Sequence, residues 1–355
     1  MRLRCWCLVI HAPDDLRLEQ QATAALGPGQ VRVRVAYGGI CGSDLHYFHA
    51  GGFGTVRIRR PMILGHEVAG TVADVADDVT RVKPGDAVAI NPSRPCRACR
   101  YCLEGLPNQC LDMRFYGSAM RDPHVEGAFR DQLVCEAIQC EPVAPQVPLQ
   151  HAALAEPLSV ALHGVQRAGP LLGREVLVSG CGPIGALAVA AARIHGAARI
   201  TAVDLTDETL AIARAMGADE TVNVSQDSGW TQRYSANKGH FDVMFECSGN
   251  ERALQAGLEV MRPRGTVVQL GLGGEVRIPQ NLIVAKELSL CGSFRFHAEF
   301  ALAVRLINEG RIDLRPIITG AFPLARAREA FELAADRRRA MKVLLDFSAL
   351  PGSAD

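Results

Sequence analysis

The stretch VLVSGCGPIGALAVAAARIHG, residues 176–196, decides the fold of this chain. It opens with an apolar, branched run typical of a buried strand, and its alanine-rich second part predicts a helix that ends at a glycine. Between the two lies the pattern G-x-G-x-x-G, in which glycines allow a tight turn and let the backbone approach a pyrophosphate at the helix N-terminus. The residues predicted to bind a dinucleotide here are Gly180, Gly182, Pro183, Ile184 and Gly185.

A carboxylate follows this turn at the expected distance. Asp204 ends the next predicted strand, 19 residues after Gly185. In that place a carboxylate accepts hydrogen bonds from ribose hydroxyls and repels a 2′-phosphate, which favours NAD over NADP. Two other interpretations stay open: a glycine turn that holds no nucleotide, and an acid that only caps the following helix.

Strands and helices alternate around the turn, which predicts an α/β, doubly wound parallel sheet covered on both faces. The strands are expected at 174–180, 199–205, 241–249 and 266–272, and the helices at 183–196, 207–218 and 251–265.

The first 150 residues have a different texture, with short β-like runs separated by Gly and Pro. Alternating residues predict strands at 31–38, 66–75 and 85–90, and this half is interpreted as an all-β, barrel-like domain. The runs 288–296, 298–312, 327–340 and 341–347 are interpreted as a return into that domain plus closing helices. We therefore expect a discontinuous β domain formed by 1–155 and 295–355, and an α/β domain formed by 156–294.

Composition excludes several classes of protein. The 355 residues contain 38 Lys+Arg and 38 Asp+Glu, and this zero net charge argues against binding to nucleic acid or to an anionic membrane. Residues 176–192 carry no charge, but three glycines and a proline argue against a membrane span. Twelve cysteines without an export signal predict reduced thiols in a cytoplasmic protein.

Four of the cysteines have metal-ligand spacing. Cys96, Cys99, Cys102 and Cys110 form a C-x2-C-x2-C-x7-C array in the segment 94–112. Four thiolates close a tetrahedral site, which is typical of structural zinc. Disulfides and an iron–sulfur cluster are the alternatives, but a ferredoxin-type run has a proline after its last cysteine, where this chain has leucine.

A second group is dispersed along the chain: Cys41, His66, Glu67 and Glu156. Apolar residues and glycines flank each of them, so an unpaired charge would be costly to bury. A Cys/His/carboxylate set that leaves one position open is typical of catalytic zinc. Taken singly, each residue also fits a plainer role as a buried cysteine, a core histidine or a helix-capping acid.

These motifs together resemble the zinc-containing medium-chain dehydrogenase/reductase family, and within it the sorbitol (polyol) dehydrogenase branch. The stretches that carry the resemblance are CGSDLHY (41–47), GHEVAG (65–70), the four-cysteine segment, AEPLSV (155–160), GCGPIG (180–185) and GSFRF (292–296). The resemblance implies a GroES-like β-barrel catalytic domain and a Rossmann domain. It also implies a substrate cleft between the two domains and assembly as a dimer or tetramer.

The resemblance also implies roles for single residues. Cys41 and His66 would bind catalytic zinc, together with Glu67 and Glu156, of which one is a ligand and the other a ligand or water-holder. A proton relay would run from Ser43 to His46, although a turn hydroxyl and a loop histidine are the plainer interpretations. The residues implied to line the substrate pocket are Tyr47, Phe115, Arg295 and Phe296, and further candidates are Arg114, Arg121 and His124.

The stretches 89–102 and 108–129 are similar to those of a bacterial subgroup that acts on a sugar acid. The expected reaction is NAD-dependent oxidation of L-idonate at C5 to 5-ketogluconate. The alternatives are a dehydrogenase of sorbitol or another polyol, and a catalytically silent protein that binds NAD and zinc. The run 204–209 lacks the arginine that the family carries after the acid, which weakens an NADP interpretation without removing it.

Overall fold

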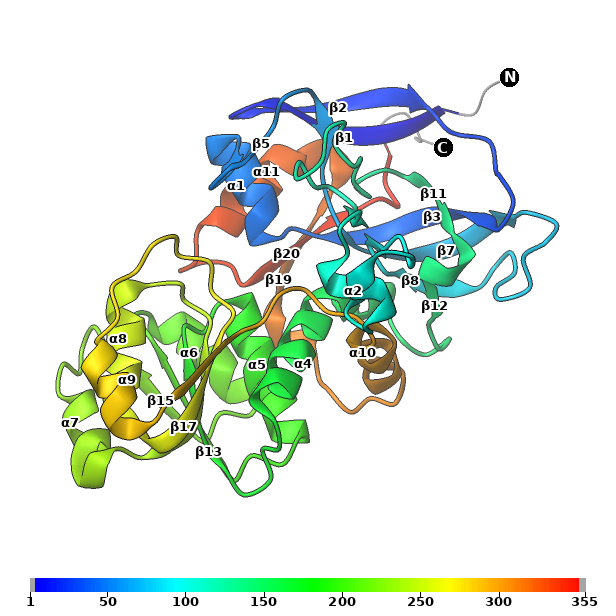
Figure 1. The fold of residues 1–355 in the computed structure, drawn as a ribbon. Helices are drawn as coiled ribbons and strands as arrows, with labels where there is room; N and C mark the ends of the chain where they lie inside the picture. The colour runs from blue at the N-terminus through cyan, green and yellow to red at the C-terminus, as the bar shows by residue number, and fades with distance from the viewer. Residues whose placement is uncertain (1–3, 351–355) are drawn as a thin grey trace.

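The computed structural model describes residues 4–350 and shows two lobes, one made mainly of strands and the other of alternating strands and helices (Figure 1). Both ends of the described chain lie in the first lobe. The charge-free run 176–192 is divided between a strand and a helix of the second lobe. Within residues 4–350, no helix has the length and apolar character needed to cross a membrane.

A seven-stranded sheet forms the centre of the first lobe. Its order is β12-β8-β7-β3-β20-β19, and β11 also pairs with β3. The strands are β3 (Gln30–Gly39), β7 (Glu67–Val75), β8 (Ala87–Ile90), β11 (Gln132–Glu136), β12 (Cys140–Pro142), β19 (Ile318–Pro323) and β20 (Lys342–Asp346). A three-stranded sheet contains β1 (Arg4–Ala12), β2 (Asp15–Ala22) and β6 (Met62–Ile63). Leu8, Val33 and Phe129 belong to the core of this lobe, and the three strands predicted here from alternation are confirmed as β3, β7 and β8.

The last part of the chain completes the seven-stranded sheet. β20 pairs antiparallel with β3, with Leu344 opposite Gly39, and β19 pairs in parallel with β20. Between them, α11 (Ala327–Ala335) packs Phe331 into the core of the first lobe. The domain limits 1–155, 156–294 and 295–355 stay a prediction, and their outer ends fall outside the described residues.

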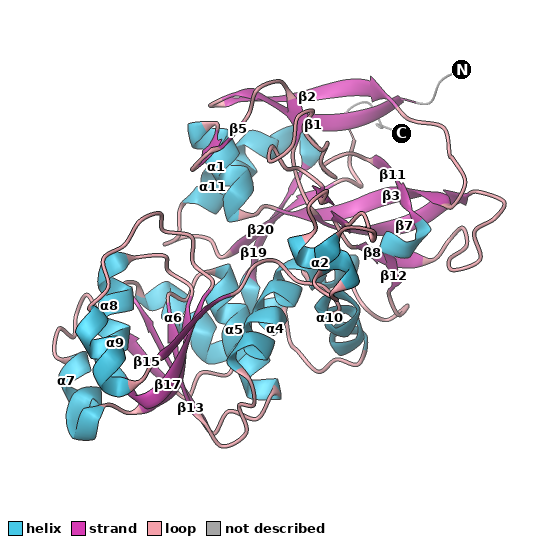
Figure 2. Cartoon of the chain, viewed as in Figure 1, coloured by secondary structure: helices cyan, strands magenta, loops and turns pink. Residues whose placement is uncertain are grey.

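The second lobe is a parallel sheet of six strands in the order β15-β14-β13-β16-β17-β18. The strands are β13 (Glu175–Ser179), β14 (Arg199–Asp204), β15 (Glu220–Asn223), β16 (Phe241–Glu246), β17 (Met261–Gln269) and β18 (Ser289–Gly292). The helices are α4 (Ala155–Ala168), α5 (Pro183–Ile194), α6 (Asp207–Ala215), α7 (Trp230–Ser235), α8 (Glu251–Val260) and α9 (Gln280–Lys286). Leu187 of α5 and Leu210 of α6 lie in one core cluster, whereas Trp230 of α7 and Leu254 of α8 lie in another. Helices therefore cover both faces of the sheet, as the alternating pattern predicted (Figure 2).

Two expectations about this lobe were wrong. The helix expected at 251–265 ends at Val260, because Met261 has an extended backbone (φ −68°, ψ 136°) and Pro263 offers no N–H for a helix. β17 therefore begins five residues earlier than the expected strand at 266–272. The run 288–296 starts with β18, which extends the six-stranded sheet, so the return to the first lobe begins after it.

The two lobes share a continuous core. One cluster of buried side chains joins Ala69 of β7, Leu158 of α4 and Phe300 of α10. His163 of α4 also pairs with Glu299 of α10 at 2.9 Å. The remaining elements are α1 (Gly42–Ala50), α2 (Arg100–Leu103), α3 (Leu149–Ala152), α10 (Glu299–Asn308), and the pairs β4 (Gly52–Phe53) with β5 (Val56–Arg57) and β9 (Ser93–Arg94) with β10 (Arg114–Phe115).

Candidate active site and metal sites

The glycine turn joins β13 to α5 in the geometry that the motif requires. Gly180 has φ +87°, and a Cβ on Gly185 would lie 1.9 Å from the Gly180 carbonyl oxygen, so neither position accepts a larger residue without strain. A Cβ on Gly182 would meet no atom within 4 Å, so space remains in front of the turn. Gly182 is the N-cap of α5, and Pro183 and Ile184 are its first two residues. An open helix N-terminus of this kind fits a pyrophosphate.

Asp204 lies beside the turn, at the carboxyl end of β14. Its Oδ2 accepts a hydrogen bond from the Cys181 N–H, and its Oδ1 accepts one from the Leu205 N–H. The carboxylate is thereby held at the edge of the turn, where it fits the ribose role expected of it.

The four cysteines of the segment 94–112 come together in one cluster. Their Sγ atoms all lie within 4.8 Å of one another, and a tetrahedral zinc with bonds of about 2.3 Å needs sulfurs about 3.8 Å apart. Backbone N–H groups point at the sulfurs: Cys96 N–H donates to Cys110 Sγ at 3.1 Å, and Cys99 N–H donates to Cys96 Sγ at 3.3 Å. Hydrogen bonds from the N–H groups of Cys102 and Leu111 lower the pKa of Cys99 to about 6, whereas burial raises the pKa of Cys102 to about 12. The hydrogen bonds favour at Cys99 the thiolate form that zinc binds.

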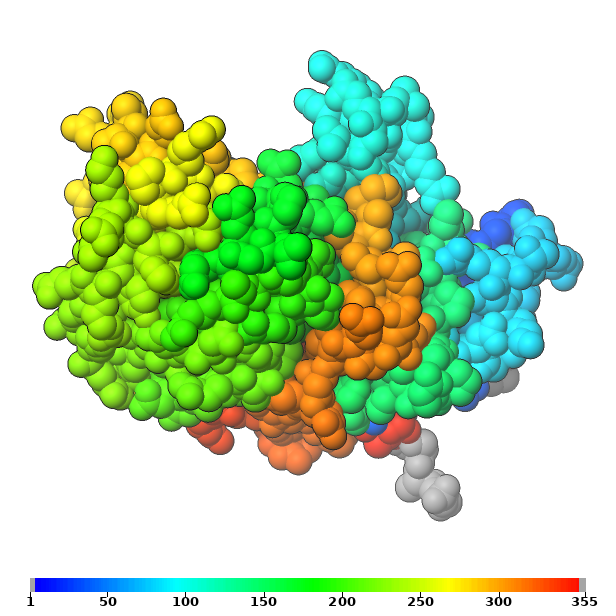
Figure 3. Space-filling model, turned by 90° about the horizontal axis from the view of Figure 1, so that it is seen from below, coloured from blue at the N-terminus to red at the C-terminus, as the bar shows by residue number. Residues whose placement is uncertain are grey.

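This four-cysteine segment stands out from the body of the molecule, where it is cyan in Figure 3. Among the described residues, the segment contains α2 and a 3₁₀ turn at Pro107–Gln109. No side chain of α2 is buried, and no residue of the segment belongs to a hydrophobic core cluster. The segment therefore lacks an apolar core of its own, which fits a metal as the group that holds it together.

The second group of predicted ligands also converges, although its members come from separate elements. One ligand atom each from Cys41, His66 and Glu67 lies within 4.8 Å of the others. Cys41 is the N-cap of α1, His66 precedes β7 and Glu67 begins it. Burial, reinforced by the charge of Glu67, raises the pKa of Cys41 to about 12, and His66 Nδ1 is buried without a hydrogen-bond partner. This donor set fits a cation.

Glu156 lies just outside this compact group, in the first turn of α4. Its side chain is buried, and burial raises its pKa to about 8, with His66 opposing the shift and Glu67 adding to it. The geometry brings Glu67 closer to the other two ligand candidates than Glu156. Which carboxylate binds the metal stays a prediction.

Two residues that the sequence motifs did not predict hold the predicted metal ligands in place. Asp44 Oδ2 accepts the Cys41 N–H at 3.0 Å and its Oδ1 accepts the Gly65 N–H at 3.1 Å, so one carboxylate ties the Cys41 turn to the His66 turn. The sequence feature that could have identified Asp44 is its position three residues after Cys41, the N-cap of α1, where an acid often caps the helix.

Lys342 is the other missed residue. Its Nζ donates to both carboxylate oxygens of Glu67 at 2.8 Å and to the Ile40 carbonyl at 3.2 Å. Burial is the largest single effect and works against its charge, but Glu67, Cys41 and Glu156 together outweigh burial and raise the pKa of Lys342. The signal in the sequence was a lysine directly before the apolar run VLL (343–345) of β20.

The two residues of the expected proton relay lie three positions apart on α1, so they share one side of that helix. Ser43 is half-buried, and its N–H bonds to Cys41, whereas His46 is exposed beside Phe53. Ser43 therefore adjoins the metal group, and His46 lies toward solvent.

The four residues predicted to line the substrate pocket lie in different surroundings. Phe115 packs its ring 5.5 Å from that of His66, and the Arg295 guanidinium lies 4.1 Å from the Phe115 ring centre. Tyr47 is buried, and its hydroxyl accepts the Ala119 N–H at 3.0 Å. Phe296 is also buried, stacked on Phe300, so its contact with substrate stays a prediction.

The three further candidates of the 112–127 loop are occupied or exposed. His124 Nε2 accepts the Arg59 N–H, and its Nδ1 contacts the Arg121 carbonyl, so both ring nitrogens serve the loop itself. Arg121 pairs with Asp112, and Arg114 is exposed. A substrate role for His124 is therefore not supported by its hydrogen bonds.

Comparison with known proteins gives the class of protein that this fold and site define. Residues 27–145 match the family model of the alcohol dehydrogenase GroES-like domain, and residues 183–309 match that of the zinc-binding dehydrogenase. The two matches together cover more than half of the chain. The chain belongs to the zinc-binding dehydrogenase family, with a GroES-like β-barrel domain and a Rossmann-type α/β domain.

Particular relatives narrow the class. The chain is 44% identical to L-idonate 5-dehydrogenase (NAD(P)(+)) of Escherichia coli K12, over 89% of this chain and 91% of the relative. It is 35% identical to human sorbitol dehydrogenase, over 92% of this chain and 91% of that one. The crystal structure of the Escherichia coli L-idonate 5-dehydrogenase superposes with a TM-score of 0.94 at 41% identity, covering 98% of this chain and 99% of the other.

Proposed function

We propose that this chain is a zinc- and NAD(P)-dependent dehydrogenase that oxidises L-idonate at C5 to 5-ketogluconate, reversibly. The observation that carries the substrate class is Arg295, a half-buried cation separated from the ligand candidate His66 by the ring of Phe115. No carboxylate of residues 4–350 forms an ion pair with it. A guanidinium binds the carboxylate of a sugar acid, or two hydroxyls of a polyol, through two hydrogen bonds, and the relatives favour the sugar acid.

The relatives support the same substrate. The Escherichia coli relative, named for L-idonate and for NAD(P)(+), is more similar to this chain than the human sorbitol dehydrogenase. The relative from Vitis vinifera that is named for L-idonate matches over 97% of this chain at 34% identity.

The residues of the site have separate tasks in this reaction. When bound, zinc supplies a Lewis acid that lowers the pKa of an alcohol, and NAD accepts a hydride. Cys41, His66 and Glu67 would hold the metal, with Glu156 beside them. Loss of hydride from C5 leaves a carbonyl, so the hydroxyl proton has to leave the site; Ser43 takes it next to the metal group, and His46 passes it to water.

The cofactor preference in this proposal is for NAD. Asp204 would accept hydrogen bonds from the adenosine ribose, and its charge would repel a 2′-phosphate. Asp207 and Glu208, the first two residues of α6, add negative charge close by. NADP remains an accepted alternative, because the Escherichia coli relative is named for both cofactors.

The proposal includes a cytoplasmic homo-oligomer, a dimer or a tetramer, that pairs through β18. This strand is the last of the six-stranded sheet, so its outer edge has no partner strand within residues 4–350. Exposed apolar side chains lie on this strand at Leu290 and two residues after it at Phe294. An exposed apolar strand edge favours pairing with a second copy.

The experiment that tests the substrate is direct. NADH formation is measured with zinc-replete protein on L-idonate and on sorbitol under identical conditions. The proposal expects a kcat/KM for L-idonate at least tenfold above that for sorbitol. The reverse preference would assign the chain to polyol oxidation, and no turnover of either would favour a catalytically silent protein that binds NAD and zinc.

A further inference from the structure

Glu246 is a fully buried carboxylate whose hydrogen-bond partners are all neutral. It is the last residue of β16, and its side chain is 0% exposed. Burying a carboxylate is costly unless hydrogen-bond donors surround it. A fully buried glutamate in this position therefore indicates that the carboxylate itself holds the surrounding backbone in place. It belongs to neither of the two metal groups.

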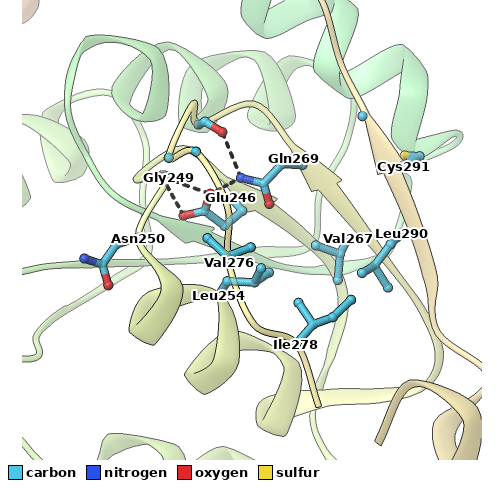
Figure 4. Close-up of a pocket in the computed structure, with 14 residues that line it drawn as sticks. Glu246, Gly249, Asn250, Leu254, Val267, Gln269, Val276, Ile278, Leu290 and Cys291 are labelled. Carbon is cyan, nitrogen blue, oxygen red and sulfur yellow. Dashed lines mark hydrogen bonds between the residues drawn. The ribbon is translucent and has the colours of Figure 1, made fainter. Parts of the chain in front are cut away.

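Its first set of donors comes from the turn that follows β16. Oε1 accepts the Ser248 N–H at 2.9 Å and also the Ser248 hydroxyl. Oε2 accepts the Gly249 N–H at 3.0 Å (Figure 4). The carboxylate therefore fixes the backbone of the turn 247–249 from inside.

Its second set of contacts comes from the end of β17. The Gln269 side-chain amide donates to Oε2 and also to the Gly271 carbonyl at 2.9 Å (Figure 4). The main-chain carbonyl of Glu246 accepts the N–H groups of Leu270 at 2.8 Å and Gly271 at 2.9 Å. One residue thus joins the carboxyl ends of two neighbouring strands.

The turns that Glu246 joins have no room to shift against each other. A Cβ on Gly273 would lie 1.6 Å from the Gly249 carbonyl oxygen, and a Cβ on Gly271 would lie 2.2 Å from the Gly249 nitrogen. The turn 247–249 also touches the glycine fingerprint, because a Cβ on Gly180 would lie 2.7 Å from the Ser248 nitrogen. The position of these turns therefore depends on Glu246.

The position of the turns 247–249 and 270–273 in the sheet indicates which part of a dinucleotide they face. A doubly wound sheet consists of two mononucleotide-binding halves and binds its ligand beyond the carboxyl ends of the strands, where the strand order reverses. The first half, β13 to β15, carries the glycine fingerprint and Asp204 and so faces the adenosine end. The second half, β16 to β18, faces the nicotinamide end, and the turns held by Glu246 follow the carboxyl ends of β16 and β17.

We propose that Glu246 is a positioning residue for the nicotinamide half of the cofactor, acting through the turns 247–249 and 270–273 and touching neither cofactor nor substrate. The same network continues toward the substrate. The Gln269 main-chain carbonyl accepts the Ser293 N–H at 3.0 Å, and Ser293 precedes Arg295 by two residues. Glu246 therefore supports the nicotinamide wall and the start of the segment that carries the substrate arginine.

The test measures cofactor binding in the absence of any sugar. NADH and ADP are titrated by fluorescence and calorimetry into the zinc-replete full chain, as wild type and as Glu246→Gln. The variant keeps the shape of the side chain but replaces one acceptor oxygen by a donor that faces other donors. The Kd for NADH is expected to rise at least tenfold, while the Kd for ADP, which lacks the nicotinamide half, changes less than twofold.

A matched control lies on the same strand. Asp242 is a buried carboxylate near the other end of β16, where it pairs with Arg174 and Arg262. Asp242→Asn is expected to lower the melting temperature and leave the Kd for NADH within twofold of wild type. If Glu246→Gln does not fold, Gln269→Leu removes the shared donor and is expected to give the same NADH-specific loss.

An unchanged Kd for NADH, or an equal loss for NADH and ADP, would overturn the proposal. So would a loss of NADH binding in Asp242→Asn as large as that in Glu246→Gln. None of these readouts involves L-idonate, so they are independent of whether the proposed substrate is correct.

Discussion

Arg295 keeps its charge in a half-buried place beside two aromatic rings. Its guanidinium lies 4.1 Å from the ring centre of Phe115 and 4.9 Å from that of Phe294. Burial lowers its pKa to about 10, opposed by Glu156, so at neutral pH it stays protonated. Its backbone has φ +56°, which is costly for a residue with a side chain and is tolerated where packing fixes it. These features describe a cation held ready for an anionic group.

Replacing this cation should therefore separate acidic from neutral substrates. In Arg295→Leu, kcat/KM for L-idonate is expected to fall about 10- to 100-fold, mainly through KM, because a hydrogen bond to a charged group contributes roughly 1.5–3 kcal/mol. Activity on sorbitol should change less. Steady-state kinetics check this, with Arg114→Gln as the control, since Arg114 is exposed next to Phe115. An equal loss on both substrates would contradict a carboxylate-binding role.

Asp204 sets the charge preference on the cofactor side. In Asp204→Ala, kcat/KM with NAD is expected to fall about tenfold or more, because the ribose loses its acceptor, while NADP is used relatively better because the repulsion is removed. The measurement is the ratio of kcat/KM for NAD and NADP in wild type and variant. A ratio that does not change would mean that Asp204 only orders the turn through Cys181.

Single residues were predictable from sequence where a motif fixes their chemistry. Cys41, His66 and Glu67 were proposed as ligands from their residue types and flanking glycines, and the structure brings them together. Lys342 was not found, because its partner Glu67 is 275 residues away and no local pattern connects them. Pairing across such distances is a property of the sheet, in which β20 lies beside β3 and β3 beside β7.

Among the elements, the four-cysteine segment should depend on its metal for its structure. Cys99→Ser removes one of four ligands, so the zinc content should fall from about two to about one per chain, and the melting temperature should fall by several degrees. Elemental analysis and thermal denaturation measure both. Cys291→Ser, a cysteine outside both metal groups, is the control and should keep the wild-type zinc content.

The outer strand β18 is the element that the oligomer proposal depends on. Leu290→Lys places a charge on its exposed apolar edge, so the mass measured by light scattering should fall toward the 38.2 kDa of one chain. Leu172→Lys alters a residue that is 83% exposed in the loop before β13 and should keep the wild-type mass. A wild-type protein that is already monomeric would refute the oligomer.

Whether a segment forms a helix or a strand was easier to predict than the residues at which it begins and ends. The helix expected at 251–265 contained a good amphipathic pattern, but its last turn included Pro263 and Gly265. Met261 instead pairs with Phe241 of β16, and an irregular stretch separates it from the regular pairing that starts at Thr266. The short elements β15, α7 and α9 have too few residues for a clear period. β13 is also short, but its apolar run directly before the glycine fingerprint identified it, and the longer α5 had a clear pattern; both lie where the sequence placed them.

At the scale of the whole molecule, the site exists because the chain leaves the first lobe and returns to it. α4 carries Glu156 from the second lobe to the metal group, and the segment after β18 brings Arg295 to the same place. A chain with zero net charge can bind an anionic cofactor and a sugar acid in this way, because helix N-termini, metal and single buried cations supply the charge locally. The sequence predicted two domains of these types, but the meeting of these side chains required the structure.

The central claim is that this chain transfers the hydride from C5 of L-idonate to NAD. The most direct measurement uses L-idonate deuterated at C5 and follows the label in the reduced cofactor by mass spectrometry or NMR. We predict that the deuterium appears in the nicotinamide ring and that 5-ketogluconate accumulates in equal amount. Unlabelled NADH formed from this substrate, or turnover of sorbitol with none of L-idonate, would contradict the account.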